Sequence, residues 1–155
     1  MYPPVQELLA QTGEMALLEH LEHHSPQETV CLATPGNATW FLNRDGRAPS
    51  WLSLEYMAQC VAVHGNLTAR LLGEEVRAGL LLGSRSLVFS TPDMDPHQTL
   101  RICARPVRLG ELATFDCEVL QGKENTPVAS GRLNVLRNLD FTPPHRKAID
   151  DRPHI

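Results

Sequence analysis

One long apolar segment constrains the fold of this chain more than any other feature. Residues 49–72, PSWLSLEYMAQCVAVHGNLTARLL, predict a helix with apolar side chains on most of its faces. Ser50 is placed to cap its first turn, and Gly73 marks its end. Such a helix must be covered on several sides, so other parts of the chain have to wrap around it. Glu55, near the helix start, is the only acidic residue in the segment.

The rest of the chain contains segments with the pattern of β-strands. We expect strands over residues 29–34, 79–89, 99–107, 112–120 and 128–136. The last four are separated by turn-rich stretches at hairpin spacing, which favours an antiparallel sheet. Residues 5–21 predict a short helix, a turn and the start of a strand. In the loop over residues 35–50, Trp40, Phe41 and Leu42 are expected to form a buried anchor.

One long helix and five or six antiparallel strands predict an α+β domain over residues 1–137. Residues 138–155 are polar and proline-bearing, and we expect a loosely ordered tail. The formal net charge of −4 disfavours a nucleic-acid partner. The sequence has neither a signal-peptide pattern nor an apolar run long enough to cross a membrane, which predicts a cytoplasmic protein. Four widely spaced cysteines lie in apolar runs and are expected to be reduced and structural: Cys31, Cys60, Cys103 and Cys117.

The sequence around Glu55 resembles that of a known enzyme family. Residues 49–59 read PSWLSLEYMAQ, which is similar to the Pro, apolar run, acid and Met-Ala-Gln of the hotdog-fold 3-hydroxyacyl-acyl-carrier-protein dehydratases. Glu19 stands where that family has an Asp, and the similarity extends to Leu136. The dehydratase-like subunit of aryl polyene biosynthesis is a still closer match. Its motifs correspond here to Phe41-Leu42, Asp45-Gly46, Pro49-x-Trp51, residues 54–59 and ASGRLN at residues 129–134.

The resemblance implies a hotdog fold, in which a five- to six-stranded antiparallel sheet wraps a central helix. It also implies loss of water from a 3-hydroxyacyl thioester carried by acyl carrier protein, in fatty-acid or aryl polyene type biosynthesis. The reaction needs an acid and a base but no cofactor and no metal. Glu55 would be the acid, and backbone amides at the helix start would face the thioester oxygen. The implied substrate-binding residues are Phe41, Ser50, Trp51, Leu52 and Gln59.

The sequence departs from the family pattern at the base. The catalytic His of the fatty-acid dehydratases falls on Phe41, and no histidine lies between His24 and Glu55. Ser50 replaces a Gly whose amide would polarise the substrate carbonyl. Family members form dimers whose sites take the His and the acid from different subunits. The chain is therefore expected to form a homodimer, or a heterodimer in which a His-bearing homologous subunit supplies the base.

Other residues offer alternative interpretations. Glu55, Gln59, Ala62 and Asn66 could simply form a wet helix face. Asp45 could act as a base, although a turn and an ion pair with Arg47 also fit it. The seven histidines are expected to have different roles. His64 is expected to be a hydrogen-bonded core or interface residue, His20, His23 and His24 have a spacing that could bind a metal on a helix, and His97, His145 and His154 fit the surface.

Two rival functions remain at this stage. One is a hotdog acyl thioesterase, and the other is a non-catalytic subunit that holds an active homologue in shape. The carrier protein implied by the resemblance is acidic, so docking requires a positive patch. The arginines available for it are Arg44, Arg47, Arg70, Arg77, Arg85, Arg105 and Arg108.

Overall fold

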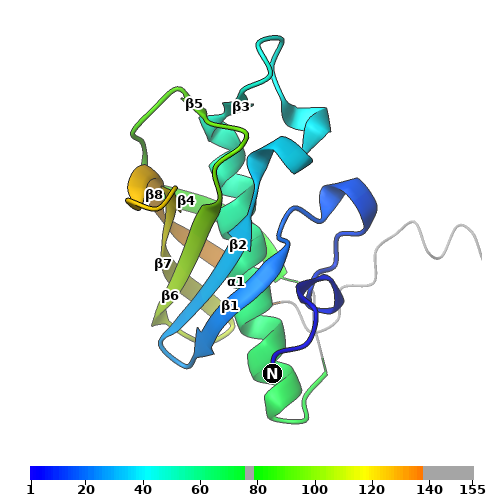
Figure 1. The fold of residues 1–155 in the computed structure, drawn as a ribbon. Helices are drawn as coiled ribbons and strands as arrows, with labels where there is room; N and C mark the ends of the chain where they lie inside the picture. The colour runs from blue at the N-terminus through cyan, green and yellow to red at the C-terminus, as the bar shows by residue number, and fades with distance from the viewer. Residues whose placement is uncertain (76–78, 138–155) are drawn as a thin grey trace, which may run out of the picture.

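The computed structural model describes residues 1–75 and 79–137. A long helix, α1 (Ser53–Leu71), lies against a six-stranded antiparallel sheet that curves around it (Figure 1). The strands are β1 (His20–Ser25), β2 (Glu28–Ala33), β4 (Gly79–Phe89), β6 (Leu100–Arg108), β7 (Leu112–Gln121) and β8 (Thr126–Arg137). The short strands β3 (Ala48–Pro49) and β5 (Asp93–Met94) pair separately. The predicted α+β arrangement is confirmed, while the expected tail, with His145 and His154, and Arg77 lie outside the described residues.

Within the described residues, five short 3-10 helices connect these elements. They are η1 (Val5–Leu8), η2 (Gly13–Met15), η3 (Pro35–Asn37), η4 (Thr39–Phe41) and η5 (Ser50–Leu52). The first two belong to the N-terminal segment, the next two form the loop before the helix, and η5 leads directly into α1.

The strand order across the sheet is β1-β2-β6-β7-β8-β4. Strands β6, β7 and β8 form the expected successive hairpins. The position of β4 in the sequence, just before β6, suggests that these two strands pair. Instead, β4 pairs with β8 at the far edge of the sheet. The chain leaves β4, forms β5 against β3, and returns to the middle of the sheet through β6. As a result, β4 is an edge strand.

The start of a strand expected within residues 5–21 corresponds to β1, which begins at His20, but β1 extends to Ser25 through residues where the sequence predicts only a polar bend. Its residues, HLEHHS, are mostly polar and only partly covered, so they carry no apolar alternation. Pairing with β2 nevertheless makes them an edge strand, with a bulge between Leu21 and His23. The predicted strand over residues 29–34 is confirmed as β2, although it is the second strand along the chain and not the first full strand. The idea that His20, His23 and His24 share a helix is wrong, because all three lie in β1.

The helix is buried on two sides. Toward the sheet, the Cys60 thiol approaches the carbonyls of Thr29 and Ile102 at 3.6 and 3.4 Å. Toward the N-terminal segment, the Asn66 side chain donates to the Leu8 carbonyl at 2.8 Å. A third strip, including Ala58 and Ala62, is only partly covered. Burial on several faces, predicted from the apolar pattern, is confirmed.

The two ends of α1 differ in how well they were predicted. At the C-terminus, Gly73 has a φ of 70°, and the amides of Gly73 and Glu74 close back onto Arg70 and Ala69. This confirms the stop signal. At the N-terminus, Ser50 lies in η5, and its buried hydroxyl has no hydrogen-bond partner within the described residues. The predicted Ser50 cap is therefore wrong, because η5 places the α-helix start three residues later.

All four cysteines are free and buried, as expected. Burial raises the pKa of the Cys117 and Cys103 thiols, the latter to about 11, so these groups stay protonated near neutral pH. No helix among the described residues is long and apolar enough to cross a bilayer.

A pair of histidines, the buried His64 and the partly buried His24, lies between the helix and the sheet. The Thr29 hydroxyl is 2.8 Å from Nδ1 of His64 and 2.8 Å from Nδ1 of His24. A hydroxyl has a single proton, so it donates to one ring and accepts from the other. His64 also packs edge-on against Phe115, with ring centroids 5.4 Å apart. His64 is thus the hydrogen-bonded core residue expected from the sequence.

This pair predicts a loss of stability in mild acid. Burial lowers the pKa of His64 to about 4, with a smaller contribution from nearby His24. The unfolded chain binds a proton near pH 6.5 and the folded chain resists it. Stability is therefore complete above pH 6.5 and falls as the pH drops toward 4, by at most about 3 kcal/mol. Urea unfolding at pH 7 and pH 5 checks this, and an equally steep loss in His64→Gln would contradict it.

Candidate active site

Glu55 lies in the first turn of α1, where its carboxylate is partly covered. Its Oε1 atom accepts a hydrogen bond from the Gln59 side-chain amide at 3.0 Å. The two residues are one helical turn apart, so their side chains meet on one face. One carboxylate oxygen is held in place, and no other side chain among the described residues hydrogen-bonds to the second.

Gln59 connects Glu55 to the N-terminal segment. It is fully buried, its Nε2 donates to the Met15 carbonyl at 2.8 Å, and its Oε1 accepts from the Leu17 amide at 2.9 Å. The reading of Gln59 as part of a wet helix face is therefore wrong. The same contacts turn its amide toward Glu55 and the protein backbone.

Aromatic side chains lie beside the helix start. Phe41, at the end of η4, packs edge-on against Trp51 of η5, with ring centroids 6.4 Å apart. The position aligned with the catalytic His of the fatty-acid dehydratases is therefore next to the start of the helix. Leu52 and Ser50 are buried, whereas Trp51 is 59% exposed. Trp40 is 72% exposed, so the prediction that it anchors the loop in the core is wrong for the single chain.

Glu19 holds the loop that carries Phe41. Its two carboxylate oxygens accept from the Thr34 amide and the Asn37 side chain, each at 2.6 Å. Glu19 precedes β1, while Thr34 comes directly before η3 and Asn37 is its last residue, so the contact ties the loop to the sheet. Gly36 permits the close approach on the other side, because its amide bonds to the Pro96 carbonyl and an added Cβ would lie 2.6 Å from that oxygen.

Two buried hydroxyl groups near the helix start have no hydrogen-bond partner within residues 1–75 and 79–137. They belong to Ser50 and Tyr56. Tyr56 is fully buried, and burial, with the nearby Glu19 charge, raises its pKa far above the usual range. The first amides of a helix also lack intrahelical acceptors. This end of α1 therefore combines a carboxylate with donors that can face an acyl oxygen.

The alternative base candidates are placed elsewhere. Asp45 lies in the exposed turn between Asn43 and Arg47, and Arg47 pairs with Asp93 rather than with Asp45. His97 is exposed, and its backbone amide donates a hydrogen bond to the side chain of Asp95. No histidine of the described chain hydrogen-bonds to Glu55. The described residues also contain no group of three His, Cys, Asp or Glu side chains able to hold a metal ion.

Sequence reasoning did not foresee the roles of Glu19 and Gly36 in holding the loop. A resemblance placed Glu19 at the position of a family Asp, but no local pattern connects it to Thr34, fifteen residues later. The contact between Glu55 and Gln59 did have a signal, namely their i, i+4 spacing on the helix.

Comparison with known proteins identifies the family. A model of the ApeP-like proteins, described as ApeP dehydratase, matches residues 3–143. The chain belongs to the ApeP-like dehydratase family. No curated protein matches it by sequence. A solved structure, the dehydratase heterocomplex ApeI:P from Xenorhabdus doucetiae, resembles this ApeP-like chain with a TM-score of 0.84 and 25% identity, covering 98% of this chain and 100% of that one.

More distant structures share the fold alone. A hypothetical thioesterase from Streptococcus pneumoniae TIGR4, solved with coenzyme A, has a TM-score of 0.61 and 17% identity, covering 79% of this ApeP-like chain and 88% of the other. The E. coli PaaI protein has a TM-score of 0.60 and 15% identity, covering 76% and 81%. Together with the wrapped helix, these similarities confirm the expected hotdog fold.

Proposed function

We propose that this chain is the acid-bearing subunit of a dehydratase that acts on 3-hydroxyacyl thioesters of an acyl carrier protein in aryl polyene biosynthesis. A second, homologous hotdog subunit supplies the base. The observation that carries this proposal is the site at the start of α1, which has an acid but no histidine among the described residues. Glu55 is held by Gln59, while Phe41 occupies the neighbouring place where the related dehydratases have their His.

The reaction then proceeds between the two subunits. The partner's base removes the C2 proton of the substrate, the C2–C3 double bond forms, and the C3–O bond breaks. Glu55 gives its proton to the departing hydroxyl group, which leaves as water. Helix-start amides, including those of Trp51 and Leu52, stabilise the negative charge that develops on the thioester oxygen. In this scheme Gln59 is a positioning residue, because its buried amide orients the Glu55 carboxylate.

The exposed edge of the sheet supports a partner subunit. Strand β4 is exposed along nearly its whole length, and its free edge offers unpaired backbone groups to another strand. Its exposed apolar side chains are Leu80, Leu81, Leu82, Val88 and Phe89. An apolar edge of this length is a liability in an isolated chain, so pairing with a second hotdog subunit explains it. The structurally similar ApeI:P is itself a heterocomplex.

Reconstitution tests the proposal. The purified chain alone is expected to dehydrate 3-hydroxyacyl carrier protein at a rate near background, and adding the His-bearing subunit is expected to restore turnover to the enoyl thioester. Mass spectrometry of the acyl carrier protein follows the loss of water directly. Full activity of the isolated chain would contradict the divided site, and release of a free acid would identify a thioesterase instead.

The same experiment separates the structural alternative. A subunit that only stabilises the fold of an active homologue would raise the activity of that partner even when Glu55 is replaced. Mixing the partner with wild-type chain or with a Glu55→Gln variant distinguishes the two cases, provided that native mass spectrometry shows equal complex formation.

A further inference from the structure

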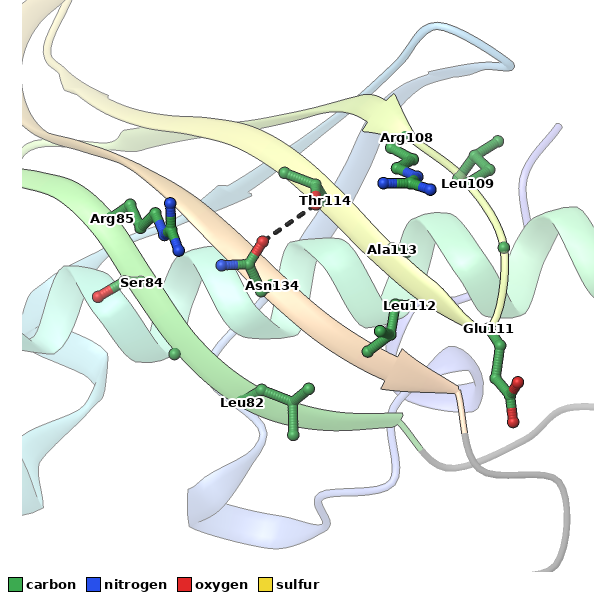
Figure 2. Close-up of a pocket in the computed structure, with 12 residues that line it drawn as sticks. Leu82, Ser84, Arg85, Arg108, Leu109, Glu111, Leu112, Ala113, Thr114 and Asn134 are labelled. Atoms are coloured by element: carbon green, nitrogen blue, oxygen red, sulfur yellow. Dashed lines mark hydrogen bonds between the residues drawn. The ribbon is translucent and has the colours of Figure 1, made fainter.

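A pocket of about 650 Å³ lies on the sheet, apart from the candidate active site. Figure 2 shows it on the face of β4, β7 and β8 that points away from α1, with the turn between β6 and β7 at one end. None of the predicted site residues lines it. Its floor is a hydrogen-bonded cross-strand pair, in which the Thr114 hydroxyl donates to Oδ1 of Asn134 at 3.0 Å.

The pocket presents hydrogen-bond donors and positive charge. Arg85 and Arg108 both line it, and neither has a salt-bridge partner among the described residues. The Oδ1 atom of Asn134 accepts the hydrogen bond from Thr114. The NH₂ group of Asn134 can therefore donate to a ligand in the pocket. Glu111 is the one acidic residue in the lining, and its side chain points away from both guanidinium groups (Figure 2).

Most of the other described arginines are paired; Arg44 and Arg137 are the two further ones without a salt bridge. Arg47, Arg70 and Arg105 from the predicted docking candidates each pair with a carboxylate of the same chain. Arg101 and Arg132, on the same face of the sheet as the pocket, are paired with Glu22 and Asp116. Arg85 and Arg108 differ from Arg44 and Arg137 in lining the same pocket, which concentrates positive charge at one place on a chain with a net charge of −4.

Apolar groups surround the two arginines. Leu82, Leu109 and Leu112 line the pocket and are 56%, 63% and 59% exposed. An open pocket with leucines beside free guanidinium groups suits an amphipathic protein surface better than a small, fully hydrated anion. One wall of the pocket is β4, the edge strand that we propose to pair with the partner subunit. A protein bound in the pocket would therefore lie beside the subunit interface.

We infer that this pocket is the docking surface for the carrier protein, and that it binds an acidic amphipathic helix. Carboxylates of that helix pair with Arg85 and Arg108, while its apolar side chains cover Leu109 and Leu112, the two pocket leucines outside β4. The inference rests on the proposed function, because it takes the acidic acyl carrier protein as the source of the helix. It adds the place of docking and the residues that select the carrier.

The test compares a carrier-bound substrate with the same acyl group on a pantetheine thioester, using the assembled complex. The double variant R85E/R108E is expected to raise KM for the carrier-bound substrate tenfold or more, while KM for the pantetheine thioester stays at its wild-type value. R85Q/R108Q, which removes charge without reversing it, is expected to have a smaller effect in the same direction. R44E/K123E, which also reverses two positive charges but on exposed turns outside the pocket, is the matched control and is expected to change neither KM.

The outcomes are distinguishable. Raised KM for both substrates, or an unchanged KM for the carrier, would overturn the docking inference while leaving the dehydratase intact. Loss of the heteromer in native mass spectrometry would show that the pocket receives the partner subunit instead. Binding of free pantetheine phosphate that depends on both arginines, with no effect on the carrier, would assign the pocket to a small anion. No dehydration of either substrate by the wild-type complex would refute the proposed function itself.

Discussion

Glu55→Gln is expected to lower kcat of the assembled complex by about 10²- to 10⁴-fold, the range for loss of a positioned acid. Gln has nearly the shape of Glu but no proton to give to the departing hydroxyl group. The change leaves the Gln59 contact possible, because the new side chain retains a carbonyl oxygen as acceptor. KM is expected to change little, since the carboxylate acts mainly in the transition state.

The measurement is single-turnover dehydration of carrier-bound substrate, followed by mass spectrometry. Glu14→Gln, which neutralises an exposed glutamate in η2, is the matched control and is expected to retain full activity. A fully active Glu55→Gln complex would show that this chain supplies no acid, and would favour the non-catalytic subunit.

Gln59→Leu is expected to impair both the fold and the reaction. The substitution leaves the Leu17 amide and the Met15 carbonyl without their partner in a buried setting. Each unsatisfied group costs about 1–3 kcal/mol, so we expect a total loss of about 2–6 kcal/mol in the free energy of unfolding. Glu55 also loses the donor that orients it, and kcat is expected to fall by about 10-fold or more.

Denaturant unfolding of the chain and kcat of the complex test the two parts. Asn66→Ala is the control, because Asn66 lies on the same helix and makes one side-chain bond to the N-terminal segment, to the Leu8 carbonyl. It is expected to lose about 1 kcal/mol and to keep its kcat. If Gln59→Leu lowers stability but leaves kcat at the wild-type value in folded complex, then Gln59 does not position the acid.

Much of the architecture could be predicted because its signals are local. The long apolar segment identified α1, and the strand-like run over residues 79–89 matches the bounds of β4. The signal failed where side chains are polar on an edge, as in β1, and where an aromatic residue lies outside the core, as with Trp40. β1 is held by backbone pairing with the neighbouring β2, which its polar side chains do not signal, and Trp40 is left uncovered by the fold around it.

The candidate site divides in the same way. The sequence by itself determined the family, the single acid at the start of the helix and the absence of a nearby histidine, because these depend on residue types at short spacings. Only the tertiary structure decided that Gln59 is buried against Leu17, that β4 is an edge, and that Arg85 and Arg108 share a pocket without a carboxylate partner from the described part of the chain. Those facts depend on contacts between segments that are distant in the chain, which no local pattern encodes.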